Sequence, residues 1–151
     1  MNRGGLAACV LVIAACQPQG TAPQSSEIEF LNLPGQVESG QPFSTAVRVD
    51  NMIYLSGVIG VHPTELRPVD GGIEAETRRA MEIIRERVEA FGSSMDRIVK
   101  CTAFLVDEND RAAMNEVYRS HFETPPARSG VTVAGIALGA RMELECIAVV
   151  K

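Results

Sequence analysis

Two charged residues in the last quarter of the chain have the types and spacing of a small-molecule site. Arg128 opens an alternating segment directly after Pro126 and Ala127, and Glu143 comes fifteen positions later, in a second alternating segment that ends the chain. A guanidinium presents planar donors that suit a carboxylate, and a carboxylate can hold or activate a water molecule. From position alone, a solvated arginine on an edge strand is the more frequent case. The same holds for Glu143 and Glu145, which share one strand face.

Other residues that could do chemistry give weaker indications. Ser56 precedes a glycine at the end of a predicted strand, where its hydroxyl could approach a ligand. Asn115 falls in the middle of a predicted helix, a mildly unfavourable place for asparagine, so it faces either a pocket or water. His62 and His121 form no evident pair. No cysteine–histidine cluster has zinc-like spacing, and phosphate-binding glycine loops and nucleophile elbows are absent from the sequence. Zinc binding, nucleotide binding and an α/β-hydrolase therefore have no support in the sequence.

The hydrophobic pattern predicts the elements that must position these residues. Apolar residues at steps of three and four predict an amphipathic helix over 73–91, and Gly92 suits its C-terminal end. A second helix is predicted over 111–122, after an acidic turn at 107–110 that offers capping oxygens. Strands are predicted over residues 28–31, 43–49, 52–57, 98–106, 128–133 and 141–150. About six strands against two helices predict an α+β domain of two layers.

Length and charge restrict the class of protein. The 151 residues fit one domain. The formal net charge of −5 argues against a nucleic-acid partner, and the absence of tryptophan leaves no evident platform for stacking bases. After residue 16 no apolar run approaches the roughly 18 residues that a membrane-spanning helix needs.

The first residues have the pattern of an export signal. Arg3 precedes an apolar stretch over 6–15, and residues 13–16 (IAAC) look like a bacterial lipobox, in which Cys16 becomes lipidated and is the new N-terminus. We expect a signal peptide over 1–15, a lipidated Cys16 with a polar tether over 16–27, and the folded domain over 28–151. A plain secretory signal that is cut elsewhere is the alternative. The expected location is the cell envelope, as a periplasmic lipoprotein whose membrane contact is the lipid anchor. Gln17 beside the cysteine favours the outer membrane.

Two cysteines remain in the predicted domain, Cys101 and Cys146, each on a predicted strand. Small buried hydrophobic side chains are their most frequent role. A disulfide is the alternative, because an oxidising compartment permits it. The spacing of the two residues does not decide between these roles.

The chain from about residue 30 to its end resembles the Rid (YjgF-like) proteins, which are reactive-intermediate deaminases. The matching motifs occur in order and at the family's spacing, and they cover nearly all of the predicted domain. They are residues 53–57 (IYLSG), 73–82 (IEAETRRAME), 98–102 (IVKCT), 114–118 (MNEVY), 126–129 (PARS) and 142–148 (MELECIA).

The resemblance implies a chorismate-mutase-like α+β fold, assembled as a homotrimer with sites in the clefts between subunits. It implies that Arg128 grips the substrate carboxylate, that Glu143 positions a water molecule, and that the backbone at Gly130 helps to hold the substrate. Residues matching Ser56 and Asn115 lie at or near the pocket. The implied reaction is hydrolysis of a short 2-imino acid, formed from an enamine, to a 2-keto acid and ammonia, with no metal or organic cofactor.

The sequence departs from the family pattern at two pocket positions. Phe43 stands where a tyrosine is frequent, and Gly130 stands where a cysteine is frequent. These departures bear on substrate range and rate rather than on the fold. An envelope-anchored imine deaminase is our first hypothesis. The alternatives are a non-catalytic trimeric lipoprotein that binds a small carboxylate, and an interaction protein with a vestigial site.

Overall fold

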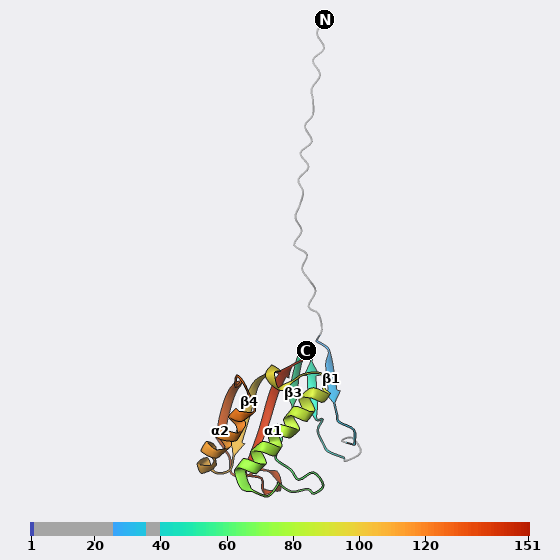
Figure 1. Cartoon of the computed structure of the whole chain (residues 1–151). Helices are drawn as coiled ribbons and strands as arrows, with labels where there is room; N and C mark the ends of the chain where they lie inside the picture. The colour runs from blue at the N-terminus through green and yellow to red at the C-terminus, as the bar shows by residue number, and fades with distance from the viewer. Residues whose placement is uncertain (2–25, 36–39) are drawn as a thin grey trace.

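A six-stranded sheet carries two α-helices on one of its faces (Figure 1). The computed structural model describes residue 1 and residues 26–35 and 40–151. In chain order the elements are β1 (Ile28–Leu31), β2 (Ala46–Val49), β3 (Met52–Leu55), α1 (Gly72–Ala90), β4 (Ile98–Leu105), α2 (Arg111–Ser120), β5 (Ala127–Thr132) and β6 (Met142–Val149), with short 3-10 helices at Met95–Arg97, Glu108–Asp110 and Ala137–Gly139. The predicted two-layer α+β class is confirmed. The expected signal segment and Cys16 lie outside the described residues.

The strand order is β1-β2-β3-β6-β4-β5. Neighbouring strands are antiparallel except β4 and β5, which are parallel because α2 crosses between them. The last strand in sequence, β6, therefore lies in the middle of the sheet, while β5 forms one edge. This order places Glu143 on a central strand and Arg128 on an edge strand, with β4 between them.

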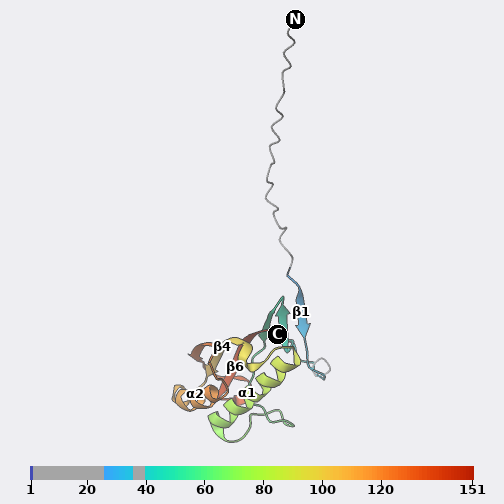
Figure 2. The ribbon, with the colours of Figure 1, turned by 45° about the horizontal axis from the view of Figure 1, so that its top comes forward.

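The core lies between the sheet and the two helices, both of which cover the same face in the turned view (Figure 2). In α1 the residues Ile73, Thr77, Ala80, Ile84 and Val88 recur at steps of three and four and are buried. The helix ends at Ala90 with Phe91 as its C-cap, and Gly92 follows with a φ of 82°. On β6 every second residue is buried, namely Met142, Leu144, Cys146 and Ala148.

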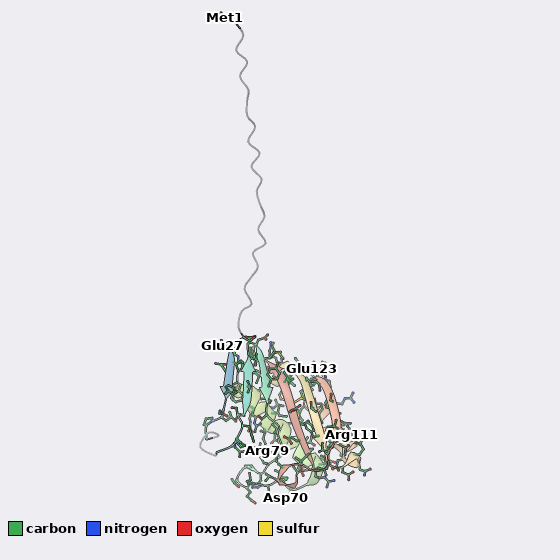
Figure 3. All side chains as sticks on the ribbon, turned by 180° about the vertical axis from the view of Figure 1, so that it is seen from behind. Met1, Glu27, Asp70, Arg79, Arg111 and Glu123 are labelled. Atoms are coloured by element: carbon green, nitrogen blue, oxygen red, sulfur yellow. A yellow bond between two sulfur atoms is a disulfide. The ribbon has the colours of Figure 1, made fainter. Side chains whose placement is uncertain are left out.

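The opposite face of the sheet carries apolar side chains that the described residues leave uncovered. Figure 3 shows this face, with the strands in front of the helices. Ile28 and Phe30 on β1 are 58% and 72% exposed, Tyr54 on β3 is 44% exposed, and Val131 on β5 is 43% exposed. A large exposed apolar surface is typical of a contact with another molecule.

Cys101 and Cys146 are joined by a disulfide. They face each other directly on β4 and β6, and both are buried. The sequence favoured separate buried side chains. Burial is confirmed, but the structure joins the two thiols, because the strand register brings together residues that are 45 positions apart. The spacing of two cysteines in the sequence does not reveal which strand positions lie opposite each other.

Two local predictions were wrong in detail. The strand predicted over 43–49 begins only at Ala46, because the preceding residues leave the ladder while Ser56 still donates its N–H to the Thr45 carbonyl. The acidic turn was expected to cap α2. Instead the Asp107 side chain accepts from the Asn109 N–H, and the Asp110 carboxylate accepts two 2.8 Å hydrogen bonds from Arg141. Among the residues that the structure describes, no helix is both long and apolar enough to cross a bilayer.

Candidate functional site

Arg128 is held in a fixed orientation against α2. The register of β5 places Arg128 beside Cys101, so its side chain lies on the face that the helices cover. One terminal nitrogen donates to Asn115 Oδ1 and the other lies 3.7 Å from the Met114 sulfur. The guanidinium carbon lies 4.7 Å from the centroid of the Tyr118 ring, a cation–π geometry. No carboxylate among the described residues forms an ion pair with Arg128.

A shallow hollow surrounds this guanidinium. It is lined by Asn115, Tyr118, Arg119, Pro125, Pro126 and Arg128. Burial raises the pKa of the Tyr118 hydroxyl to about 12, so the ring stays neutral at physiological pH. The arrangement presents an oriented, uncompensated cation at the surface, which suits the carboxylate of a small anion.

Glu143 lies on the opposite face of the sheet. It stands opposite Phe104 in the register of β6 with β4, and its neighbours in sequence, Met142 and Leu144, are both in the core. Partial burial raises the pKa of the Glu143 carboxyl above its ordinary value of 4.5, and the like charge of Glu145 adds to the rise. A carboxyl whose pKa is raised toward pH 7 is suited to exchange protons with water.

A cavity of about 540 Å³ adjoins the Glu143 carboxylate. It is lined by Gln41, Phe43, Gly57, Val58, Ile59, Val61, Leu66, Ile83, Arg87, Ala137, Leu138 and Glu143. Gly57 makes room for the carboxylate, since a Cβ at this position would overlap the Glu143 side chain. The volume lies within the range of about 300–1,000 Å³ that is common for small-molecule pockets.

Ser56 and Gly130 are two further residues that the sequence indicated as part of the site. Each contacts a different part of the structure. The Ser56 hydroxyl donates to the Ser44 carbonyl at 2.7 Å beside the cavity. Gly130 follows Arg128 by two positions on β5, and the Arg111 guanidinium lies 2.6 Å from where a Gly130 Cβ would stand. The Arg111 side chain thus lies close to Gly130, although Gly130 itself is exposed.

The predicted site residues therefore fall into two groups within one chain. Phe43, Ser56 and Glu143 lie at or beside the cavity, whereas Arg128 and Asn115 form the hollow against α2. The structure brings together the members of each group, but it does not bring Arg128 to Glu143.

Arg87 is a cavity residue that the sequence analysis did not single out. It lies on α1 and lines the same cavity as Glu143. A signal was present, because Arg87 stands three positions after the buried Ile84 and next to the buried Val88, on the apolar side of the helix. A charged residue on that side is unusual and points inward.

The structure offers little support for metal binding in the described part of the chain. Across residue 1, 26–35 and 40–151, no group of three or more histidine, cysteine, aspartate or glutamate side chains could hold a metal ion.

The structure is thus an α+β protein with an oriented arginine in a shallow hollow on one face of the sheet and a partly buried glutamate beside a cavity on the other. The chain belongs to the endoribonuclease L-PSP family, also called the Rid family, because the model of that family matches residues 35–150. This confirms the family indicated by the sequence motifs.

Named relatives and solved structures agree with this assignment. The chain is 39% identical over 109 residues to the mouse 2-iminobutanoate/2-iminopropanoate deaminase, covering 72% of this chain and 81% of the mouse protein. It is similar to the crystal structure of the Escherichia coli YjgF gene product, with a TM-score of 0.68, 36% identity, and coverage of 73% and 89% of the two chains. It is also similar to E. coli TdcF with bound serine, with a TM-score of 0.69, 34% identity, and coverage of 74% and 90%.

Proposed function

We propose that this protein hydrolyses short 2-imino acids, and the enamines that tautomerise to them, to 2-keto acids and ammonia. The observation that carries the proposal is the Arg128 guanidinium, which Asn115 and Tyr118 orient and which no described carboxylate neutralises. The names of the mouse relative and of similar proteins from human and cattle point to the same reaction. The E. coli relative with bound serine supports a ligand of this size.

In the proposed mechanism Arg128 binds the substrate carboxylate and Glu143 positions a water molecule. The water oxygen bonds to the imine carbon while Glu143 accepts a proton from the water, and the C=N electron pair moves to nitrogen, which takes up a proton. The C–N bond of the resulting carbinolamine then breaks. The nitrogen leaves as ammonia, and the hydroxyl loses its proton as the keto oxygen forms. Because imines are intrinsically reactive, positioning supplies much of the acceleration.

This mechanism requires more than one copy of the chain. Arg128 and Glu143 lie on opposite faces of the sheet, so a site that uses both must combine Arg128 of one copy with Glu143 of another. The exposed Phe30, Tyr54 and Val131 on the open face offer an apolar surface for such assembly. We propose a homotrimer with one site in each cleft between neighbouring copies.

The proposal is tested by generating a short 2-imino acid with an amino-acid oxidase and following imine loss and ammonia release. The wild type should accelerate both, and Arg128→Ala should lower kcat/KM at least about a hundredfold, since a charge-assisted carboxylate contact is lost. Arg78→Ala is the matched control, because Arg78 is exposed on α1 and away from both hollows. A full rate in Arg128→Ala would overturn the assignment. Thermal stabilisation by 2-oxobutyrate without turnover would support the carboxylate-binding alternative instead.

We also propose that the protein is exported and anchored to the envelope through a lipid on Cys16. The IAAC sequence supports this, and so does the Cys101–Cys146 disulfide, because disulfides persist mainly in oxidising compartments. Metabolic labelling with an alkyne fatty acid should mark the wild type and leave Cys16→Ser unlabelled and in the soluble fraction. Equal labelling of both proteins, or of neither, would refute the anchor.

A further inference from the structure

Arg87 is a partly buried cation that the mechanism above does not use. Its Nε is buried and has no hydrogen-bond partner, and Nη1 makes one long hydrogen bond of 3.4 Å to the Ser56 carbonyl. No carboxylate of the described residues lies within ion-pair distance of it. Arg87 therefore has most of its five N–H donors unused by these residues.

An arginine in this position is unfavourable for folding. Burial lowers the pKa of the Arg87 guanidinium, yet arginine keeps its charge at physiological pH, so the chain bears the cost of desolvating a cation. An apolar side chain of similar size would line the same cavity without that cost. The unused donors and the unpaired charge together indicate that Arg87 binds a ligand group.

The lining of the cavity indicates which ligand group Arg87 would bind. Its walls are largely apolar, with Phe43, Ile59 and Leu138 among them, and its charged residues are Arg87 and Glu143. A substrate side chain that carried a second carboxylate would be repelled by Glu143. Arg87 offsets that repulsion and offers planar donors for the incoming carboxylate.

Arg111, the other arginine near the predicted site, is already engaged. Its guanidinium makes two hydrogen bonds to the Glu108 carboxylate, and Glu108 also accepts from Thr132. Arg111 is therefore neutralised within the chain, and Arg87 is the better partner for a second acidic group.

We propose that Arg87 binds the distal carboxylate of the substrate, so that the preferred substrates are 2-imino dicarboxylic acids of about four or five carbons. This inference rests on the proposed imine hydrolysis. Arg128 would hold the carboxylate next to the imine, and the side chain would extend into the cavity toward Arg87. Arg87 is then a specificity-determining residue.

Competition between two imines tests the inference. Glutamate oxidase supplies 2-iminoglutarate, and a broad amino-acid oxidase supplies the imine of norvaline, which has a neutral side chain. Arg87→Leu should lower kcat/KM for 2-iminoglutarate by about ten- to a hundredfold and change that for the norvaline imine less than about threefold. Arg87→Lys should keep part of the preference, and Arg85→Leu, at an exposed position two residues away, should keep all of it. An unchanged ratio in Arg87→Leu, with both imines hydrolysed, would overturn the inference and leave the proposed function intact.

A binding measurement separates failure of this inference from failure of the proposed function. The probes are 2-oxoglutarate and 2-oxovalerate, and the readout is the shift in melting temperature. 2-Oxoglutarate should stabilise the wild type more than 2-oxovalerate does, and Arg87→Leu should remove the difference. If no imine is hydrolysed but this difference is seen and then lost, the proposed reaction fails while the role of Arg87 stands. If 2-oxoglutarate stabilises the wild type no more than 2-oxovalerate does, the role of Arg87 is refuted.

Discussion

Arg128 and Glu143 project from opposite faces of one sheet, with strand β4 between the strands that carry them. Arg128 stands beside the buried Cys101, whereas Glu143 stands beside Phe104 on the uncovered face. Each has its own surroundings: a hollow against α2 for the arginine, and an apolar cavity for the glutamate. One chain thus holds two different halves of the proposed site.

This arrangement predicts complementation between inactive variants. Arg128→Ala and Glu143→Gln should each be inactive alone. After the two are unfolded together in equal amounts and reassembled, about one quarter of the sites should combine an intact arginine with an intact glutamate from different copies. The measurement is imine hydrolysis by the reassembled mixture relative to wild type.

Mixing the two folded variants without unfolding them is the control and should give no recovery. Absence of activity after reassembly, with trimers formed, would show that both residues act from the same copy.

The raised pKa of Glu143 predicts the pH dependence of activity. The reaction needs the carboxylate, so kcat/KM should fall as pH decreases through a value above the ordinary 4.5 of glutamate. Glu145→Gln removes the neighbouring negative charge and should move this acidic limb to lower pH without abolishing activity. Glu143→Gln should lower kcat by about 10²–10⁴. A limb that stays in place in Glu145→Gln would contradict this account.

The raised pKa of Glu143 also makes the stability of the fold depend on pH. Activity needs the ionised carboxylate, whereas the folded state is more stable with the carboxyl protonated. Because the folded state raises the pKa of Glu143, it favours the protonated form. That contribution is present below pH 4.5 and is lost as pH rises through the raised value. Glu143→Gln should therefore be slightly more stable than wild type at pH 7 and equal to it at pH 4. Thermal unfolding followed by circular dichroism measures the difference.

The Cys101–Cys146 disulfide should contribute strongly to stability. It closes a loop of 45 positions, for which chain entropy predicts up to about 4 kcal/mol. Replacing both cysteines with alanine should lower the free energy of unfolding by about 2–4 kcal/mol, measured by denaturant titration. A reductant should destabilise the wild type and leave the double variant unchanged. Equal sensitivity of both proteins would show that the bond does not form.

Gly60 should tolerate no side chain. An added Cβ would overlap the backbone carbonyl of Glu76, where the loop after β3 crosses α1. Gly60→Ala should therefore cost more than about 2 kcal/mol of stability, since backbone must move to make room. Gly135→Ala is the control, because nothing lies within 4 Å of the added atom, and it should change stability by less than about 0.5 kcal/mol. Thermal denaturation of the two variants gives the comparison.

Periodicity predicted most of the fold. The apolar stripe of α1 and the common strand face of Glu143 and Glu145 on β6 were predicted correctly, because local patterns report which residues share a face of an element. The end of α1 just before Gly92 was also predicted, since a glycine accepts the positive φ that follows many helices.

Relations between distant segments could not be predicted in this way. The pairing of Cys101 with Cys146 and the placement of Arg128 and Glu143 on opposite faces both depend on strand order and register. Arg87 was missed for a different reason: charged side chains on a helix are usually solvated, and only its position beside the apolar stripe of α1 pointed to the cavity.

Gly57 determines where the Glu143 carboxylate can lie. A methyl group there would occupy the space of the Glu143 carboxylate and push it out of the cavity, although every atom of the glutamate would remain. Relatives with identical acidic and basic residues could thus differ in activity through this position alone. A search for active members of the family should read residue 57 together with the charged pair.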